Sequence, residues 1–445
     1  MEETISIVLI VNEEEKLAKV CLKMIKQLYP KIPVIVVDNG STDGFADWLS
    51  QEEYEFIYFD EGKQTYGKVI NTVIEQMQLQ EKILFMEPRY ILIPQVLERL
   101  LDVLDKHSEI GMVSPNSNSL IHLEKEEEEN LLTYQDLEKI AEKEKEEQIY
   151  FSLKLFQRIF LIRKELFTKV GMFEERLEEA NNAVADYALE LIQKDVKLAI
   201  CKNAYVFDMK QGYSDERHSK HDRNVLVPKW GTTYINVIYN SELLSGITHN
   251  AQEAFSVLEV GCDLGATLLE IKNRYPNSRT YGLEINQQAV AVAKHIANVC
   301  TDNIEEKNIS FSEKFDYIIF GDVLEHLHHP EEVLGYCKEL LKDNGTIIAS
   351  IPNIMHISVM EQLINGKFTY QDMGLLDETH IHFFTYYEME GMFQRQGYQI
   401  EEVGSVQMKL SESQKELKQI LSGLSENTKD FMYSTYQYIV RAVKK

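Results

Sequence analysis

The chain has 445 residues, a formal net charge of −26 and a sequence pI near 4.9. This excess of acidic residues excludes a nucleic acid as the expected partner, because binding a phosphate backbone requires clustered Lys and Arg. The length allows two or three domains, each with its own core. No run of 18 apolar residues occurs, so we expect a cytoplasmic protein without a transmembrane segment.

Two apolar runs near the start of the chain each end in a polar side chain. Residues 5–11 lead to Asn12, and residues 34–37 lead to Asp38 and a turn rich in polar residues. Buried parallel strands of this kind deliver polar groups to one edge of a doubly wound sheet. The segment between the runs carries apolar residues at helical spacing, namely Leu17, Val20, Cys21, Met24 and Leu28.

Together with residues 83–89 and 160–175, these segments resemble inverting family 2 glycosyltransferases of the GT-A fold, which use a nucleotide-sugar donor. The resemblance implies that Asp186 is the catalytic base. It also implies that Asn12, Asp38, Ser41 and Asp43 form the nucleotide pocket.

The chain departs from this family where paired aspartates would hold a cation. Glu87 and Arg89 stand at that motif, and Asp208 replaces a frequent histidine ligand. One hypothesis is that Arg89 substitutes a fixed positive charge for the metal, since guanidinium binds phosphate oxygens bidentately. The alternative is a degenerate domain that binds weakly or only scaffolds. We assign no metal ligand, and the use of a divalent cation stays open.

Residues 213–250 form the predicted linker between the halves, and their aromatic content indicates packing against one domain. The linker follows a glycosyltransferase-like domain at residues 1–212. A second doubly wound domain is predicted at residues 251–405. A helical tail is predicted at residues 406–445.

The second domain begins with a strand, a glycine turn and a helix. Gly261 and Gly265 follow the apolar run 257–260, and Glu284 ends the next apolar run. Such glycines allow close approach of backbone to a ligand, and a carboxylate about 20 residues later meets ribose hydroxyls. Asp263 replaces the second glycine of a dinucleotide motif, and Asp302 can accept from an adenine amino group. Both features favour S-adenosylmethionine as the cofactor.

Residues 315–327, 341–353 and 374–385 complete a resemblance to class I S-adenosylmethionine-dependent methyltransferases, specifically those fused to glycosyltransferases of bacterial surface polysaccharides. Asp263 departs from this family, which usually has glycine there. The resemblance implies a methionine-side turn of Glu259, Gly261 and Gly265, a ribose contact by Glu284, an adenine border of Asp302 and Asn303, and Asp322 at the methyl-donor end.

Histidines lie near the expected methyl-transfer site. His380 or His326 is a candidate general base, because neutral imidazole accepts a hydroxyl proton. Alternatively, a divalent cation could be held among Asp322, Glu325, His326, His380 and His382. That arrangement also resembles the metal-using terminal 2'-hydroxyl methyltransferases of small RNAs.

The sequence therefore predicts an α/β protein with a GT-A-like domain, a Rossmann-like class I methyltransferase domain and a helical tail, which could mediate oligomerisation. The expected function is bifunctional: sugar transfer from a nucleotide-sugar and methylation of a hydroxyl on a glycan or glycoprotein acceptor in bacterial surface or flagellar glycan assembly. The alternative is a methyltransferase whose first domain is a catalytically inactive glycan-binding module.

Overall fold

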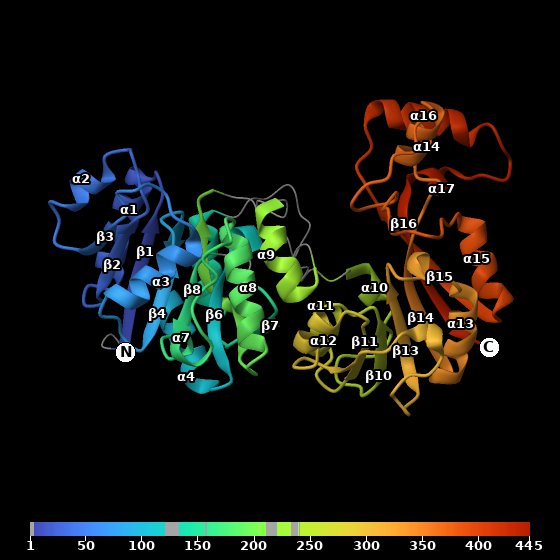
Figure 1. Cartoon of the computed structure of the whole chain (residues 1–445), viewed down its shortest axis with the longest axis horizontal. Coiled ribbons are helices and arrows are strands. Elements are labelled where there is room, and N and C mark those ends of the chain that lie inside the picture. The colour runs from blue at the N-terminus through green and yellow to red at the C-terminus, as the bar shows by residue number, and fades with distance from the viewer. Residues whose placement is uncertain (1–3, 121–132, 156–157, 211–219, 233–238, 240) are drawn as a thin grey trace. The chain divides into compact units, whose positions relative to one another are not determined.

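The computed structural model describes residues 4–120, 133–155, 158–210, 220–232, 239 and 241–445. The chain divides into two compact units, Met1–Val237 and Ile238–Lys445 (Figure 1). Parts of the predicted linker, residues 213–219, 233–238 and 240, lie outside the described residues. Among the helices described, none combines the length and apolarity needed to cross a bilayer.

The first unit is an α/β structure. Its strands are β1 (Ile5–Val11), β2 (Val34–Asp38), β3 (Glu55–Tyr58), β4 (Lys82–Met86), β5 (Tyr90–Leu92), β6 (Ile110–Ser117), β7 (Ile149–Ser152), β8 (Phe160–Arg163) and β9 (Lys197–Asp208). Its helices are α1 (Glu15–Leu28), α2 (Phe45–Leu49), α3 (Tyr66–Gln76), α4 (Val96–Lys106), α6 (Tyr134–Lys143), α7 (Leu166–Lys169), α8 (Ala180–Ile192) and α9 (Lys220–Trp230).

These strands form one sheet in the order β3-β2-β1-β4-β8-β6-β9-β5, with β7 paired to β9. The first four strands of this order are parallel, so the carboxyl ends of β2, β1 and β4 lie at the same edge. All seven residues of β1 are buried, which explains its continuous apolar sequence. The polar residues that follow these three strands are therefore neighbours in space.

Helices cover both faces of this sheet. On one face, α1 and α4 pack in a core that includes alternate residues of β1. On the other, the Tyr187 ring of α8 stacks on Phe173 with centroids 4.1 Å apart, and Phe167 contacts both Tyr187 and Phe85 of β4. The phase of α1 differs from the prediction, since its buried side chains are Ala18, Cys21, Leu22 and Ile25.

The second unit also has one sheet. Its strands are β10 (Ser256–Val260), β11 (Arg279–Leu283), β12 (Asn298–Cys300), β13 (Phe315–Gly321), β14 (Leu341–Pro352), β15 (Tyr398–Gln407) and β16 (Thr435–Lys444). Its helices are α10 (Ser241–Ser245), α11 (Ala266–Arg274), α12 (Gln287–Ala293), α13 (Pro330–Leu340), α14 (Ile357–Ile364), α15 (Tyr386–Arg395), α16 (Glu412–Ser422) and α17 (Asp430–Ser434), with 3-10 turns η2 (Ile304–Glu306) and η3 (Leu324–His326).

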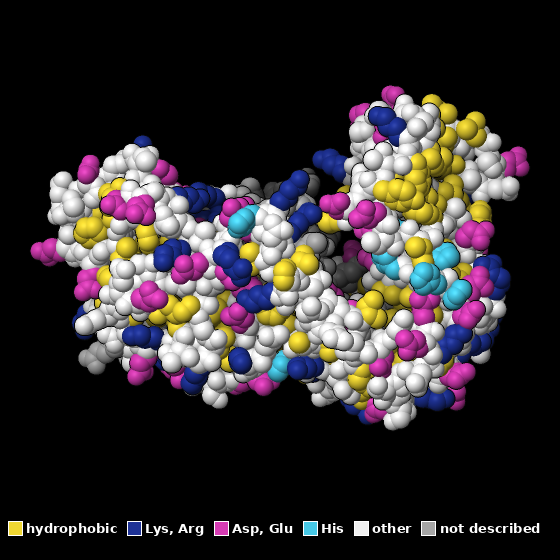
Figure 2. Space-filling view, in the orientation of Figure 1, with side chains coloured by type: hydrophobic (Ala, Val, Ile, Leu, Met, Phe, Trp, Pro, Cys, Tyr) yellow, Lys and Arg dark blue, Asp and Glu magenta, His cyan; other side chains and the backbone are white. Residues whose placement is uncertain are grey.

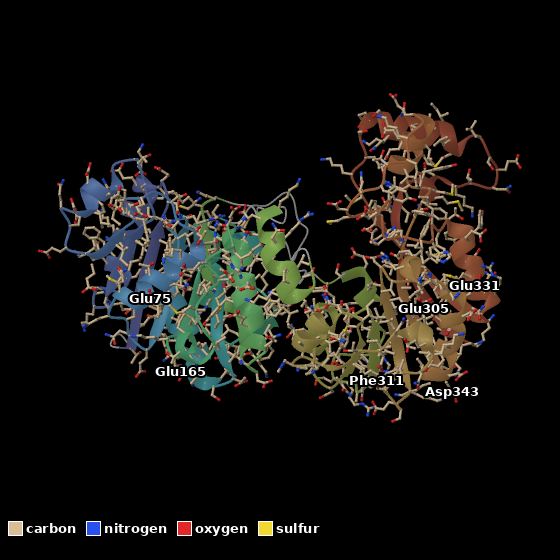
Figure 3. All side chains as sticks on the ribbon, viewed as in Figure 1. Glu75, Glu165, Glu305, Phe311, Glu331 and Asp343 are labelled. Carbon is tan, nitrogen blue, oxygen red and sulfur yellow. The ribbon has the colours of Figure 1, made fainter. Side chains whose placement is uncertain are left out.

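The strand order is β12-β11-β10-β13-β14-β16-β15. The five strands from β12 to β14 are parallel, whereas β16 is antiparallel to both of its neighbours. Near the amino ends, the Phe311 ring packs on Tyr281 and Phe315 (Figure 3). The opposite edge carries the polar residues predicted to bind a cofactor.

The end of the predicted helical tail is a strand. Residues 412–422 and 430–434 are helical, but residues 435–444 form β16 between β14 and β15. Tyr438, Val440 and Ala442 enter one core, and Ile439 enters the core on the other face. The buried residues Thr435, Tyr438 and Ile439 of this strand also fit a helical spacing, so the sequence pattern does not distinguish the strand from a helix. The tail therefore completes the sheet of the second unit.

Candidate functional site

The turn after β10 has the left-handed backbone that its sequence predicts. Gly261, Asp263 and Gly265 have φ angles of +71°, +45° and +87°. A side chain at Gly261 would place a Cβ 2.7 Å from the Cγ2 atom of Val323, so only glycine fits there. Asp263 adopts the same backbone region as the glycine it replaces, which a short polar side chain tolerates.

Glu284 ties this turn to the end of β11. Its Oε2 atom accepts a hydrogen bond from the Asp263 backbone N at 2.8 Å, and its Oε1 atom accepts from the Asn286 backbone N at 2.8 Å. A carboxylate oxygen offers two acceptor positions, so each oxygen can still accept a hydrogen bond from a ribose hydroxyl. The position is the one that the sequence predicts for a ribose contact.

Glu259 brings a second carboxyl group to the turn. Its side chain is buried, and its Oε2 atom has no hydrogen-bond partner among the described residues. Burial, together with the charges of Asp263 and Glu284, raises the pKa of Glu259 to about 8. Burial and Glu284 also raise the pKa of Asp263 to about 7. This group of carboxyls would be stabilised by a ligand cation, so the donor set fits the ammonium end of an amino-acid-like cofactor.

The other predicted cofactor residues lie at the same sheet edge. Asp302 Oδ2 accepts from the Ser310 backbone N at 2.7 Å, which closes the loop that follows β12. The Asn303 side chain caps η2. Asp322 has a φ of +54°, and its Oδ1 atom accepts from Ser350 Oγ and Gln437 Nε2 at 2.7 and 2.8 Å. Each of these three residues therefore makes a hydrogen bond within the protein, in addition to the ligand contact that the sequence predicts.

Three of the five predicted cation ligands converge. Ligand atoms of Glu325, His326 and His380 lie within 4.8 Å of one another. Both carboxylate oxygens of Glu325 are buried without a hydrogen-bond partner among the described residues, and so is His380 Nδ1. Burial, and then the charge of Asp322, raises the pKa of Glu325 well above its usual value. A carboxylate and two imidazoles suit a divalent cation, and a buried carboxyl without a partner needs a cation or a proton.

The other two candidates have different partners. Asp322 binds Ser350 and Gln437, and His382 Nε2 lies 3.3 Å from the backbone O of His328. Burial and the neighbouring His326 lower the pKa of His380, which favours its neutral form. Neutral imidazole can take a proton or bind a metal ion, so the geometry is compatible with either predicted role of His380.

An apolar rim lies near these histidines. Figure 2 shows histidine side chains gathered on the second unit, with apolar side chains beside them. Two exposed apolar residues of this region are Ile381, next to His380 in the chain, and Phe368, whose ring packs on Phe383 beside His380. An acceptor that reaches the histidines would meet this rim.

In the first unit, the predicted nucleotide residues gather after β1 and β2. Asn12 Oδ1 accepts from Asn39 Nδ2 at 2.9 Å, and Asp38 Oδ1 accepts from the Ser41 backbone N at 2.9 Å. Asp43 Oδ2 accepts from the first backbone N of α1 at 2.8 Å. Asp38 Oδ2 is buried and has no partner among the described residues, and burial raises the pKa of this carboxyl. It is therefore available to accept from a ligand N–H group.

Two further predicted residues of this unit are engaged by neighbouring side chains. Arg89 forms a bidentate ion pair with Asp208, with N···O distances of 2.8 and 2.6 Å. Asp186 has no exposed surface, because Trp230 Nε1 and Lys229 Nζ each lie 2.7 Å from one of its oxygens. Burial raises the pKa of Asp186, whereas Lys229 and Trp230 lower it.

Comparison with known families accounts for both units. Residues 6–164 match the model of "Glycosyl transferase family 2", and residues 215–403 match the model of a "Methyltransferase domain". The chain joins a family 2 glycosyltransferase domain to a methyltransferase domain. The second match begins before α9, which belongs to the compact unit of the glycosyltransferase domain. Class I methyltransferase domains bind S-adenosylmethionine, which agrees with the carboxyls and glycines of the turn.

Curated relatives named as O-methyltransferases match part of the chain. A mitochondrial ubiquinone biosynthesis O-methyltransferase of Dictyostelium discoideum is 23% identical over 150 residues, which are 30% of this chain and 46% of the relative. The ubiquinone biosynthesis O-methyltransferase of Glaesserella parasuis serovar 5 (strain SH0165) is 31% identical over 123 residues, which are 25% of this chain and 51% of the relative. The chain spans about half the length of these relatives.

Solved structures match parts of the chain at low identity. A methyltransferase from Archaeoglobus fulgidus is 17% identical, with a TM-score of 0.32, over 44% of this chain and 88% of the other. GalNAc-T7, solved with UDP, GalNAc and Mn2+, is 12% identical, with a TM-score of 0.39, over 52% of this chain and 48% of the other.

Several residues that complete the two sites were not predicted. In the methyltransferase domain, Gln437 reaches Asp322 from β16, whose strand character the sequence obscured. In the glycosyltransferase domain, Lys229 and Trp230 come from α9, which the sequence placed in the linker. The adjacent Lys229 and Trp230 in the middle of the predicted linker were the one available signal, because a buried Trp needs a partner for its N–H group.

Proposed function

We propose that the methyltransferase domain transfers a methyl group from S-adenosylmethionine to a hydroxyl of a glycan or glycoprotein in bacterial surface or flagellar glycan assembly. The observation that carries this proposal is the cofactor turn, where Glu284 accepts from the Asp263 and Asn286 backbones. The same turn holds the buried Glu259 beside Asp263, where an ammonium group would offset their charges.

Methyl transfer to a hydroxyl requires removal of the hydroxyl proton. The group formed by Glu325, His326 and His380 supplies either a neutral imidazole base or a site for a divalent cation that lowers the pKa of the hydroxyl. The curated relatives are O-methyltransferases, which supports oxygen as the methylated atom. Asp322, held by Ser350 and Gln437, lines the methyl-donor end in this scheme.

We also propose that the glycosyltransferase domain binds a nucleotide-sugar, with Asn12, Asp38, Ser41 and Asp43 around the nucleoside. The buried Asp38 Oδ2, which has no hydrogen-bond partner in the described part of the chain, supports this assignment, because it can accept from a base N–H group. In the bifunctional form of the proposal, Asp186 deprotonates the acceptor hydroxyl. Both reactions would then act on one glycan, and one chain would keep the two sites at high effective concentration.

A second candidate role for this domain rests on one observation. Asp186 is fully buried, with Trp230 and Lys229 bound to its two oxygens, so an acceptor hydroxyl does not reach this carboxylate while α9 is in place. This favours a binding module without sugar transfer, which would guide a glycan to the methyltransferase domain. Under this candidate the nucleotide site still binds a ligand, but Asp186 has a structural role.

An acceptor assay separates these possibilities. The full chain is incubated with S-adenosylmethionine, a nucleotide-sugar panel and oligosaccharide acceptors, and products are analysed by mass spectrometry. The bifunctional form predicts products that gain both a sugar and a methyl group, and Asp186→Asn abolishes only the sugar gain. Methylation alone, unchanged by Asp186→Asn, supports the binding module. The absence of methylation on every hydroxyl acceptor, in a protein that binds S-adenosylhomocysteine, would overturn the assignment of glycan hydroxyls.

A further inference from the structure

The GT-A resemblance implies a divalent cation that neutralises the diphosphate of the sugar donor, and the residues of the corresponding site do not fit one. The site lies after β4 and at the end of β9, where Glu87, Arg89 and Asp208 stand. Among the residues that the structure describes, the one cluster with metal-ligand spacing is in the methyltransferase domain. The side chains at the glycosyltransferase site are instead arranged as ion pairs.

Asp208 has no acceptor position left for a metal ion. Its Oδ1 atom accepts from Arg89 Nε at 2.8 Å and from the Lys210 backbone N at 3.1 Å. Its Oδ2 atom accepts from Arg89 Nη2 at 2.6 Å and from Ser119 Oγ at 3.0 Å. A carboxylate has about four acceptor positions, so these four donors saturate Asp208.

The other two carboxylates at this site also have basic partners. Glu87 Oε1 lies 3.3 Å from Arg158 Nε, and Glu14 pairs with Lys210. Burial raises the pKa of Glu87 above its usual value, and the opposing charges of Arg158 and Arg89 offset this only in part. A cation entering here would have to displace one of these basic side chains, which are fixed parts of the chain.

The basic side chains supply the charge that a metal ion would bring. In a site of the family's kind, two carboxylates and one divalent cation together have a net charge of zero. The three ion pairs of this site also have a net charge of zero; they are Arg89–Asp208, Arg158–Glu87 and Lys210–Glu14. Arg89 uses two of its five N–H donors on Asp208, which leaves three for phosphate oxygens. The side chain of Lys210 is 53% exposed, so it can turn toward an anion. Guanidinium and ammonium groups bind phosphate strongly through charge-assisted hydrogen bonds.

The position of this basic group matches a nucleotide that begins at Asp38. The strands β2, β1 and β4 are neighbours, with Val11 opposite Asp38 and Leu9 opposite Met86. The Asp38 Oδ2 atom and the guanidinium of Arg89 thus follow strands on either side of β1. A nucleoside bound at Asp38 would direct its diphosphate along the sheet edge toward Arg89.

We propose that the glycosyltransferase domain binds the diphosphate of its nucleotide ligand through Arg89, Arg158 and Lys210, without a divalent cation. The inference rests on the proposed nucleotide-binding function of this domain. It changes the cofactor requirement of that domain from a metal ion to three basic side chains. It applies equally to a transferase and to a binding module.

The test is a calorimetric titration of the full chain with UDP, GDP and dTDP, each in excess EDTA and in saturating manganese. We expect at least one diphosphate to bind in EDTA, with an affinity that manganese changes by less than about threefold, and the matching monophosphate to bind at least about tenfold more weakly. Binding that requires manganese would overturn the inference and leave nucleotide binding intact. No binding in either condition would overturn both.

Substitutions of the basic side chains test which residues bind the diphosphate. Lys210→Gln removes a half-exposed charge and should weaken diphosphate binding by about tenfold while leaving monophosphate binding within about twofold. Arg158→Gln should weaken diphosphate binding to the same extent. If Arg158→Gln fails to fold, the affinity of Lys210→Gln still tests the proposal. Lys169→Gln, which breaks an exposed ion pair with Glu165, is the matched control and should bind like the unmodified chain. Unchanged diphosphate affinity in Lys210→Gln and Arg158→Gln would overturn the assignment.

Discussion

Trp230 on α9 donates its indole N–H to the Oδ1 atom of Asp186 on α8 across 2.7 Å. Lys229 holds the second oxygen and also contacts Glu190. Asp222, near the start of α9, accepts hydrogen bonds from the backbone N atoms of Glu178 and Glu179, which precede α8. Hydrogen bonds therefore hold both ends of α9 against α8. Any acceptor that reaches Asp186 must displace α9.

The first prediction concerns these hydrogen bonds. Trp230→Phe keeps an aromatic ring but loses the indole N–H, which leaves a buried oxygen of Asp186 without its donor and should destabilise the packing of α9. We expect amide hydrogen exchange in α9 to accelerate by about tenfold, which corresponds to about 1.4 kcal/mol. Val227→Ala on the exposed face of α9 is the control and should leave exchange nearly unchanged. Slow exchange retained in Trp230→Phe would contradict the role of this hydrogen bond.

The second prediction concerns the group formed by Glu325, His326 and His380. Because neither oxygen of Glu325 has a hydrogen-bond partner among the described residues, we expect a divalent cation to complete this group and activate the acceptor hydroxyl. Treatment with EDTA should then lower methyl transfer by about a hundredfold or more, and a divalent cation should restore it.

Histidine variants provide the control for this experiment. His380→Ala should lose methyl transfer to a similar extent, whereas His382→Ala, whose ring lies near the His328 backbone, should retain it within about threefold. Full activity in EDTA together with loss in His380→Ala would assign His380 as a general base acting without a metal ion.

The third prediction is a pH dependence of cofactor binding. The pKa of Glu259 is raised to about 8, so its carboxyl is protonated at neutral pH in the free chain. A raised pKa stabilises the folded chain at low pH, and this contribution is lost as the pH rises through about 8. A cofactor ammonium favours the ionised carboxylate, so binding should release a proton.

The affinity for S-adenosylhomocysteine should therefore rise with pH up to about 8, by at most about tenfold per pH unit. Calorimetry in two buffers of different ionisation enthalpy measures the released proton. In Glu259→Gln, the proton release should fall and the pH dependence near pH 8 should be lost, which leaves the contribution of Asp263, whose pKa is about 7. A pH-independent affinity in the unmodified chain would contradict an ammonium beside Glu259.

The strand ends were predictable because buried parallel strands have a strong sequence signal. The apolar runs before Asn12, Asp38 and Gly261 are all strands, and the polar residues after them lie at the carboxyl edges of their sheets. Left-handed backbone at Gly261 and Gly265 was likewise predictable from residue type. These features depend on local sequence and on sheet topology alone.

The remaining features depend on tertiary packing. Val20 has the spacing of a core residue but is 52% exposed, because α1 turns a different face to the sheet. Helix α9 carries a mixture of polar and apolar residues because its polar side chains bind α8, so its sequence resembles that of a linker. The pairing of Arg89 with Asp208 joins residues 119 positions apart, and no periodic pattern indicates such a contact.

We expect the methyltransferase domain to bind S-adenosylmethionine through its glycine turn. A calorimetric titration of the full chain with S-adenosylhomocysteine is the most direct test of this expectation. We predict one site per chain and an affinity loss of about tenfold or more in Glu284→Ala, since this carboxylate holds the turn and is predicted to contact the ribose. Asp343→Ala, at the start of β14 and away from the carboxyl ends, should bind normally (Figure 3). No binding to the unmodified chain, or equal binding to Glu284→Ala, would contradict this site.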